Sequence, residues 1–370
     1  MSLRPVQRLR INLALALSAL AVATGAGAAA KNPDRLPRYD HVFVILEENK
    51  DADMILDPAN APNIARLAAQ YGVATHFYGE VHPSEANYVA LLGGDTFGIH
   101  DDDAFYCTRG STDPQCPDSK RPDYVDHTVY SRHLGEQLAD QGLTWKGYYE
   151  SLPEPGSEVI FSNDPKFPNG ERIKQLYAAK HSGFINFRDV QVDPRRAAQL
   201  VDFGQLEADV AKDALPNFAL IVPNQCNEMH GLSGKDVPED CNIGKPLLTV
   251  KRGDRIAGEI VSKLMATKTW RSKKHVAIII TFDESGKGQR EGCCAVTPTA
   301  PSNFGGGRIA TVVITNHGPR GVKDDTPYNH YSLLRTFEDV FHIDERLGHA
   351  ADLDQGVKPM TALFEVKGAK

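Results

Sequence analysis

The chain has 370 residues, of which 41% are hydrophobic and 24% are charged. This composition is typical of a folded globular protein with one large domain or two smaller ones. Its net charge of −7 argues against a general nucleic-acid-binding protein, because such proteins usually present a basic face.

Residues 1–30 have the pattern of a signal peptide. Three arginines precede an apolar run at 11–23, and small residues at 26–30 offer a cleavage site. We therefore expect an exported protein, secreted or periplasmic, whose remaining residues, 31–370, form one domain with loop insertions. An uncleaved membrane anchor is the alternative, although the apolar run is short for a membrane span. No other segment of the sequence is long and apolar enough to cross a membrane.

The six cysteines suit an exported protein. Cys107 and Cys116 flank a short polar loop and are expected to pair. The pairing of the other four cannot be fixed from their spacing. A bond between the neighbours Cys293 and Cys294 would be strained, so we expect each of them to pair elsewhere. We interpret none of the six as a metal ligand.

The first predicted elements are a strand at 41–47, a helix at 62–71, a strand at 73–81 and a helix at 84–92. This β-α-β-α order favours an α/β fold with a mostly parallel sheet. The hydrophobic pattern also predicts strands at 144–149, 218–222, 275–282 and 309–314 and helices at 131–141, 252–266 and 330–341. Segments rich in Gly, Pro, Ser or Asp separate these elements, and we interpret them as surface loops: 95–125, 151–175 and 285–307.

Two of the predicted strands end in acidic residues. The first strand runs into Glu48 and Asn49, and the strand at 275–282 runs into Asp283 and Glu284. Both strands are continuously apolar, as buried parallel strands are, and the C-terminal ends of such strands form the edge at which ligands bind. Carboxylates gathered there repel each other unless a cation lies between them, so we expect a divalent metal site. Turns with solvated acids are the alternative.

Ser84 stands at the start of a predicted helix, directly after His82 and Pro83. Serine is a preferred helix N-cap, which is one interpretation of this residue. The other is a nucleophilic hydroxyl, because backbone N–H groups at a helix start stabilise an incoming phosphate and a metal ion lowers the pKa of a bound hydroxyl. One residue can serve both purposes.

A third candidate cluster follows the strand at 218–222. Glu228 and His230 are two residues apart and share a face of an extended segment, and a carboxylate with an imidazole suits a zinc-like metal. A surface loop with an incidental histidine is the alternative. His330, ahead of the last helix, is a further candidate ligand, and His317 is a weaker one that follows the strand at 309–314. The chain has no P-loop and no Gly-x-Ser-x-Gly elbow, which argues against nucleotide cleavage by a P-loop and against α/β-hydrolase chemistry.

Five segments now show a resemblance to a known family. They occur in this order along the chain: 41–49 (HVFVILEEN), 75–88 (ending in HPSEANY), 222–230 (VPNQCNEMH), 281–284 (TFDE) and 329–336 (NHYSLLRT). Together they resemble the phosphoesterase family of bacterial phospholipases C and acid phosphatases, within the alkaline phosphatase superfamily. The resemblance implies a three-layer α/β/α sandwich with a mostly parallel central sheet and a metal-assisted Ser or Thr nucleophile.

Carried over position by position, the resemblance implies that Ser84 is the nucleophile. The group around the first metal and the phosphate is then Glu48, Asn49, Ser84, Asp283 and Glu284. The position of a second metal is then Glu228, His230 and His330. A further similar segment, 177–181 (YAAKH), places His181 near the phosphate. Asn49 with His181 or His230 is expected to bind phosphoryl oxygens or to protonate the leaving group.

Two positions depart from the family pattern. Glu228 stands where related sequences usually have Asp, and Asp283 is followed by Glu rather than by the His of alkaline phosphatases. The resemblance therefore leaves open whether one or two divalent ions bind, and whether the ion is Zn, Ca, Mg or Mn.

These observations together predict an exported, metal-dependent phosphoric ester hydrolase, most simply a phosphomonoesterase of the acid phosphatase type. A phospholipase C-type phosphodiesterase uses the same core and is the nearest alternative. A non-catalytic secreted metal- or phosphate-binding protein is an alternative of another class. The expected partner is a small-molecule or lipid phosphate ester, with no nucleic acid and no membrane span after leader removal; the oligomeric state stays open.

Overall fold

The computed structural model describes residues 36–162, 175–235, 237–286, 288–295 and 304–366. Residues from Leu36 onward form one unit. The predicted leader, 1–30, lies outside the described residues. None of the described helices combines the length and the apolar character needed to cross a membrane.

A large mixed sheet forms the centre of the fold, in the strand order β10-β2-β9-β8-β1-β7-β3-β6, with β11 paired to β2. The strands of this order, from β10 to β6, are Val322–Asp324, Gly72–Tyr78, Arg308–Thr315, Val276–Phe282, His41–Glu47, Phe218–Val222, Trp145–Tyr149 and Leu200–Val201; β11 is Tyr328–Asn329. A separate hairpin joins β4 (Phe161–Ser162) to β5 (Tyr177–Ala178). Every residue of β1, β7 and β8 is buried, as expected of strands covered on both faces.

Strand β9 is the one strand of the main order that runs against its neighbours, because it is antiparallel to both β8 and β2. The remaining pairs of that order are parallel. The C-terminal end of β9 therefore lies at the edge opposite to the C-terminal ends of β1 and β8. His317 follows β9 and bonds to Ser272 O at 2.9 Å, so the expectation that His317 reaches the acidic edge is wrong.

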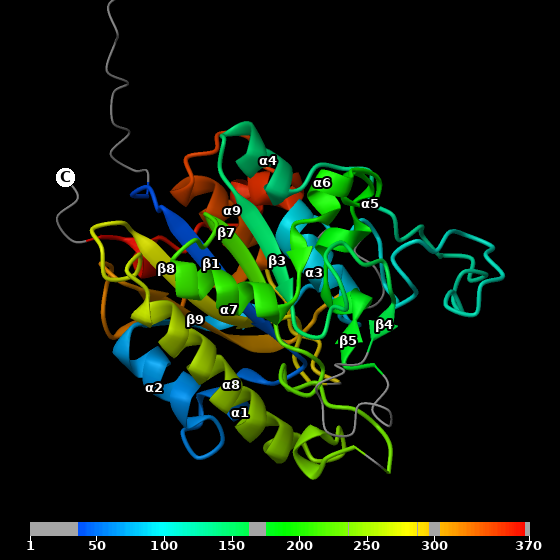
Figure 1. The fold of residues 1–370 in the computed structure, drawn as a ribbon, viewed down its shortest axis with the longest axis horizontal. Coiled ribbons are helices and arrows are strands. Elements are labelled where there is room, and N and C mark those ends of the chain that lie inside the picture. Colours follow the sequence, from blue (N-terminus) through cyan, green and yellow to red (C-terminus); the bar gives the residue numbers. More distant parts are fainter. Residues whose placement is uncertain (1–35, 163–174, 236, 287, 296–303, 367–370) are drawn as a thin grey trace, which may run out of the picture. The chain divides into compact units, whose positions relative to one another are not determined.

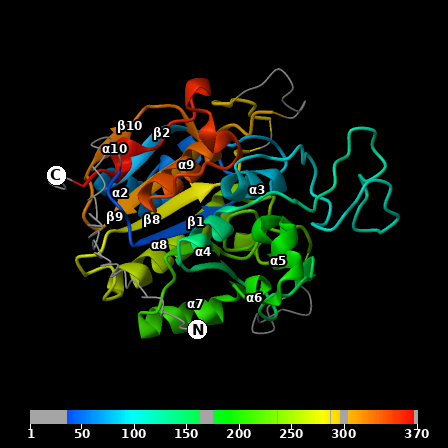
Figure 2. The ribbon, with the colours of Figure 1, turned by 90° about the horizontal axis from the view of Figure 1, so that it is seen from above.

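Helices cover both faces of the sheet (Figures 1 and 2). The longer ones are α2 (Pro62–Gln70), α3 (Glu85–Gly93), α4 (Leu134–Asp140), α7 (Phe203–Lys212), α8 (Pro246–Ala266) and α9 (His330–Val340). Four short helices are α1 (Ala52–Leu56), α5 (Arg188–Val192), α6 (Pro194–Ala197) and α10 (Thr361–Phe364). Helix α2 packs against α8, and α3 packs against α9. The predicted three-layer α/β/α sandwich is confirmed, and α8 begins at Pro246, earlier than the predicted 252.

The segment between α3 and α4, residues 94–133, forms no described helix or strand and extends from the right of the ribbon in Figure 1. The expected bond between Cys107 and Cys116 is present within it. Cys226 pairs with Cys241, and Cys293 pairs with its neighbour Cys294. The expectation that Cys293 and Cys294 pair elsewhere is wrong, because the other four cysteines are already bonded to one another.

Candidate active site

The loop between β2 and α3 brings Ser84 to the C-terminal edge of the sheet. The side chain of Asn87, one turn into α3, accepts bonds from the N–H groups of Glu80 and Val81 at 2.9 and 3.2 Å and donates to Val81 O at 2.9 Å. These bonds fold the loop back onto its own helix. At Gly79 a Cβ atom would stand 2.7 Å from the Asp283 carbonyl oxygen, so a glycine lets this loop approach the end of β8.

The Ser84 hydroxyl does not cap its helix. Ser84 occupies the N-cap position of α3 without a side-chain capping bond, and it is 1% exposed. Its Oγ instead faces three acceptors: Glu48 Oε2 at 3.1 Å, Asn49 Oδ1 at 3.4 Å and Glu284 Oε1 at 3.4 Å. The hydroxyl therefore points at the acidic strand ends, and the capping interpretation does not account for its side chain.

The acidic residues converge because β1 and β8 are adjacent, parallel and in register, with Glu47 opposite Phe282. Asn49 adopts a positive φ of 50°, which asparagine tolerates better than most residues. In this turn its backbone N–H donates to Asp283 Oδ1 at 3.0 Å and its side-chain amide donates to Glu284 Oε1 at 3.0 Å. We call Ser84, Glu48, Asn49, Asp283 and Glu284 the serine group.

The carboxyls of the serine group are buried together and raise one another's pKa. Burial and then Asp283 raise the pKa of Glu48 well above its ordinary value, and the same two causes raise the pKa of Glu284 to about 10. Burial also raises the pKa of Asp283, whose buried Oδ2 has no hydrogen-bond partner among the described residues. Three carboxyls, an amide oxygen and a hydroxyl in one buried place are the donor set of a hard divalent cation, so these residues fit such an ion.

A second cluster adjoins Glu48 at its other carboxylate oxygen, Oε1. His181 lies between two carboxylates, with Nδ1 2.8 Å from Glu228 Oε1 and Nε2 3.3 Å from Glu48 Oε1. The His230 ring is 5.4 Å from the His181 ring, and its Nδ1 is 2.7 Å from Gly231 O. Glu48, His181 and His230 present ligand atoms within 4.8 Å of one another. We call His181, Glu228 and His230 the histidine group.

Burial lowers the pKa of both histidines in this group. The pKa of His181 falls well below its ordinary value, and that of His230 falls to about 4, in each case through burial and then the charge of Lys180. Burial and the charge of Glu48 raise the pKa of Glu228 well above its ordinary value. The two imidazoles are therefore neutral near pH 7, which is the form that binds a metal or accepts a hydrogen bond.

The structure brings most of the predicted site residues together. The two groups contain Glu48, Asn49, Ser84, His181, Glu228, His230, Asp283 and Glu284. His330 is not among them, because its Nδ1 faces the Glu80 carboxylate and its Nε2 lies 2.9 Å from Phe282 O. Both ring nitrogens therefore already have protein partners. His330 supports the C-terminal end of β8 and is not part of the histidine group.

Three further side chains at this edge escaped the sequence analysis. The Tyr88 hydroxyl donates to Glu48 Oε1 at 2.7 Å, and its ring stacks on His181. His82 Nδ1 faces Glu284 Oε2, and its Nε2 lies 2.8 Å from Gln289 O. His82 and Tyr88 both lie within the segment 75–88 that carries the family resemblance, so their position in the sequence could have indicated that they belong to the site.

Lys180 is the third of these side chains and brings a positive charge to the acidic edge. Its Nζ donates to Asp102 Oδ2 at 2.7 Å, and Asp102 Oδ1 accepts the backbone N–H of Glu85 at 3.3 Å. Burial opposes the charge of Lys180, but Asp102 outweighs it and raises the pKa of the ammonium. The ammonium therefore stays charged, and its field reaches Glu48 and Glu228.

Comparison with known proteins agrees with this geometry. The profile of the phosphoesterase family matches residues 54–344. The chain belongs to the phosphoesterase family. It is accordingly a hydrolase that acts on phosphoric ester bonds, as the segments around Ser84 and the strand ends predicted.

Two curated relatives show how far the similarity extends. The chain is 27% identical over 317 residues to the phosphatidylinositol-3-phosphatase of Mycobacterium tuberculosis, covering 86% of this chain and 81% of that protein. It is 27% identical over 299 residues to the acid phosphatase of Aspergillus fumigatus, covering 80% of this chain and 53% of that protein. The chain thus spans about half the length of the fungal relative.

Solved structures share this fold, and one of them is a protein of the alkaline phosphatase superfamily. A member of that superfamily from Vibrio parahaemolyticus superposes with a TM-score of 0.50 at 14% identity, covering 86% of this chain and 70% of the other. The lipoteichoic acid synthase LtaP from Listeria monocytogenes gives a TM-score of 0.50 at 11% identity, covering 91% and 78%. At these identities the similarity is one of fold.

Proposed function

We propose that this protein is an exported, metal-dependent phosphomonoesterase of the acid phosphatase type that uses Ser84 as its nucleophile. The observation that carries the proposal is the direction of the Ser84 hydroxyl. It leaves its own helix uncapped and faces Glu48, Asn49 and Glu284 at the edge where β1 and β8 end. A serine with only a structural role at a helix start would instead accept a bond from a backbone N–H of the first turn.

The residues of the serine group suit the two halves of such a reaction. In the first half the Ser84 oxygen attacks phosphorus, the bond to the leaving oxygen breaks, and the serine proton passes to solvent; Glu48 Oε2, 3.1 Å from Ser84 Oγ, orients the hydroxyl. The leaving oxygen takes a proton from solvent. In the second half water attacks phosphorus and the bond to Ser84 breaks; one water proton stays on the released phosphate, and the other is matched by a proton that returns to the serine oxygen.

Other groups stabilise charge on the phosphoryl oxygens. The start of α3 and the Lys180 ammonium both present positive charge beside Ser84. Glu48, Asp283 and Glu284, with Asn49 Oδ1, are the residues that would hold a divalent cation. When bound, such a cation supplies Lewis-acid polarisation of the phosphate and a lowered hydroxyl pKa. Since His230 is neutral above about pH 4, we assign the histidine group to hydrogen bonding or metal binding rather than to protonation of the leaving group.

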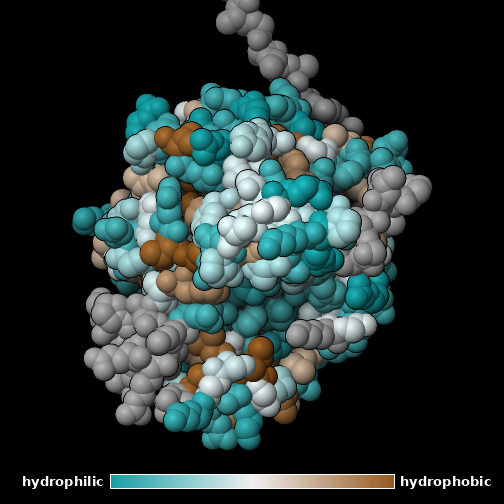
Figure 3. Space-filling model, turned by 90° about the vertical axis from the view of Figure 1, so that its right-hand side faces the viewer, coloured by the Kyte–Doolittle hydropathy of each residue, from teal (hydrophilic) through white to brown (hydrophobic). Residues whose placement is uncertain are grey.

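Two observations favour a monoester over a phospholipid diester. The curated relatives are named as an acid phosphatase and a phosphatidylinositol-3-phosphatase, and both names describe removal of a terminal phosphate. Figure 3 faces the right-hand side of Figure 1, and its described surface is mostly hydrophilic, with hydrophobic residues in small separate groups. A surface of that kind suits a water-soluble substrate or a headgroup more than an acyl chain.

Export rests on the leader pattern of 1–30 and on the disulfides of the described residues. Disulfides persist in oxidising compartments. Intact-mass measurement of the protein recovered from the periplasm or medium tests this part of the proposal. A mature chain that begins near residue 31 supports it, and a chain that retains the apolar run contradicts it.

The nucleophile is tested by Ser84→Ala with an aryl phosphate as substrate. We expect kcat to fall by at least about 10³-fold, and the phosphoseryl species trapped from the wild type at low pH to disappear. Ser332→Ala is the matched control, because Ser332 is another buried serine near a helix start but bonds only within its own helix cap. Full activity of Ser84→Ala contradicts the mechanism. Hydrolysis of a phosphocholine ester in preference to the aryl phosphate contradicts the substrate class.

A further inference from the structure

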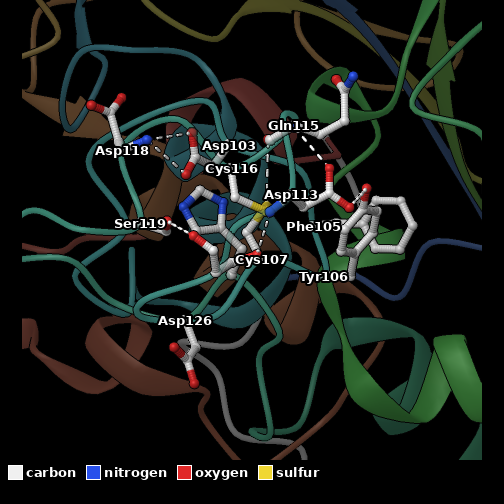
Figure 4. The surroundings of a disulfide bond; sticks show 12 residues. Asp103, Phe105, Tyr106, Cys107, Asp113, Gln115, Cys116, Asp118, Ser119 and Asp126 are labelled. Carbon is white, nitrogen blue, oxygen red and sulfur yellow. Dashed lines mark hydrogen bonds between the residues drawn. A yellow bond between two sulfur atoms is a disulfide. The ribbon is translucent and has the colours of Figure 1, made fainter.

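The insertion between α3 and α4 contains a second convergence of acidic side chains, well separated in sequence from the serine group. Asp101, Asp103 and Asp118 present carboxylate oxygens within 4.8 Å of one another. Asp101 and Asp103 are buried, and Asp118 is half-buried. Figure 4 shows Asp103 beside Asp118, next to the Cys107–Cys116 disulfide. We call these three aspartates the insertion cluster.

The negative charge of Asp103 has no cationic partner among the described residues. Its two oxygens accept only the backbone N–H of Asp118, at 3.3 and 3.2 Å. A buried carboxylate without an ion-pair partner is costly, so the site as a whole favours the approach of a cation.

A separate side chain points to the same place. The Tyr124 hydroxyl is fully buried and has no hydrogen-bond partner of normal geometry among the described residues. It lies beside Asp103 and Asp101, and its hydroxyl is directed toward Asp103. Asp101 Oδ2 is also buried without a hydrogen-bond partner among the described residues. A buried tyrosine hydroxyl beside the cluster and an unpaired carboxylate oxygen within it indicate a polar ligand there.

The nearby histidine does not supply the missing charge. His127 Nε2 lies 2.9 Å from Asp101 Oδ1, and its Nδ1 lies 3.0 Å from Glu85 Oε1. Burial opposes protonation, but Glu85 and Asp101 together raise the pKa of His127 to about 10. Its single charge is thus divided between the two carboxylates that it contacts, and it acts on Asp103 only through space, without an ion pair.

We propose that the insertion cluster binds a structural divalent cation, Ca²⁺, at a site distinct from the serine group. Carboxylate oxygens without imidazole or thiolate ligands are the chemistry that Ca²⁺ prefers. The ion holds the insertion around its disulfide and fixes Asp102, which stands between Asp101 and Asp103 in sequence. Asp102 in turn bonds Lys180 and the start of α3, so the ion positions two elements of the active site without touching substrate. This inference does not depend on the proposed nucleophile.

The test uses the full mature chain with its resident active-site metal in place. Adding Ca²⁺ is expected to raise the melting temperature of the wild type by more than about 2 °C. Asp103→Asn and the milder Asp118→Asn should lose that rise. Asp113→Asn should keep it, because Asp113 is an exposed aspartate of the same insertion that bonds Gln115 N.

A second measurement does not depend on the stability of the Asp103 variant. Tb³⁺ replaces Ca²⁺ and luminesces when an excited tyrosine is close, so Tb³⁺ is added to Glu284→Gln protein, in which the serine group competes less. We expect tyrosine-sensitised luminescence that falls on Tyr124→Phe and that excess Ca²⁺ displaces. Equal Ca²⁺ responses in wild type, Asp118→Asn and Asp113→Asn would overturn the proposal. So would a Tb³⁺ signal in Glu284→Gln protein that is absent or that Asp118→Asn leaves unchanged.

Discussion

The serine group contains Glu48 and the histidine group contacts it, but the buried acidic side chains of the two groups have different hydrogen-bond partners. In the histidine group, Glu228 has a neutral imidazole 2.8 Å away, so its oxygen is matched by a hydrogen-bond partner. In the serine group, Asp283 retains a buried oxygen with no partner among the described residues, and burial with its neighbour raises the pKa of Glu284 to about 10. The difference supports our proposal that a cation binds in the serine group. The histidine group has the smaller need of one, since its unpartnered atom is a neutral ring nitrogen, His181 Nε2, and not a carboxylate oxygen.

This contrast bears on the number of metal ions. The histidine group still presents ligand atoms close enough for an ion, together with Glu48. A proton and a metal ion compete for the same carboxyl oxygens in both groups, so metal binding should release protons. More protons should be released from the serine group, whose carboxyls have fewer hydrogen-bond partners. One tightly held ion in the serine group is the simplest arrangement consistent with the two environments.

Among the variants that compare the two groups, the largest effect is expected from Glu284→Gln. This change removes a carboxylate from the serine group while keeping its shape, so metal affinity and kcat/KM should each fall by at least about 100-fold. Metal content after dialysis and aryl phosphate hydrolysis provide the two measurements. Asp51→Asn is the matched control, because Asp51 bonds Gly286 N in the adjacent turn and lies outside the group. Unchanged metal content in Glu284→Gln would remove the distinction between the two groups.

A smaller effect is expected from Glu228→Gln. The amide can still bond to His181, so the histidine group should keep its arrangement, and kcat should fall by about 10-fold through the changed field at Glu48. Metal content should stay at the wild-type value. If instead the wild type holds two ions per chain and this variant holds one, the histidine group is a second metal site and the contrast drawn above fails.

The sequence predicted that the members of the serine group would meet at one edge of the sheet, because their positions follow directly from local pattern. A continuously apolar strand places Glu48 and Asp283 at one edge, and a helix start places Ser84 there. Such features depend on a few adjacent residues and on the general geometry of parallel sheets. The three-layer fold was predictable for the same reason.

The errors arose where the outcome depends on distant partners. The direction of β9 is set by pairing with β8 and β2, and the hydrophobic pattern at 309–314 carries no sign of direction. That is why His317 was assigned to the wrong edge. His330 was placed with a second metal, but Glu80 and Phe282 O occupy its ring nitrogens. Contacts of this kind join segments far apart in sequence, and a single sequence does not reveal them.

Lys180→Met tests the lysine ammonium whose charge acts on both groups. Its ammonium lies near both groups and is held by Asp102 at 2.7 Å. Removal of one positive group beside a transferring phosphoryl should lower kcat by about 10-fold to 100-fold, with a larger effect on kcat/KM for doubly charged than for singly charged phosphate esters. Lys146→Met is the matched control, because the partner of Lys146, Asp209, lies away from this edge. Lys50→Met is unsuitable, because Lys50 is itself buried and bonds Met229 O. Equal losses for both ester types would assign Lys180 to structure alone.

The smallest effect concerns a buried carboxyl that belongs to neither group and whose pKa is raised mainly by burial. Glu338 is fully buried in α9, and its Oε1 accepts the Leu347 N–H at 2.9 Å. Burial raises its pKa to about 7, so the folded protein holds a proton that the unfolded chain, with a pKa of 4.5, releases. The resulting stabilisation is complete below about pH 4.5 and is lost as pH rises through about 7, a change of about 3 kcal/mol in the free energy of unfolding.

Glu338→Gln keeps the acceptor oxygen and removes the titration. Its free energy of unfolding should therefore change less between pH 4.5 and 8 than that of the wild type, as measured by urea denaturation across that range. Glu365→Gln, at an exposed position of the same residue type, should leave the wild-type slope intact. If Glu338→Gln followed the wild-type curve, burial with only the minor contribution of Asp339 would not be enough to shift the pKa of a carboxyl in this fold. The raised pKa values of the serine group would then have to come from the mutual repulsion of its acids, and the case for a cation between them would be stronger.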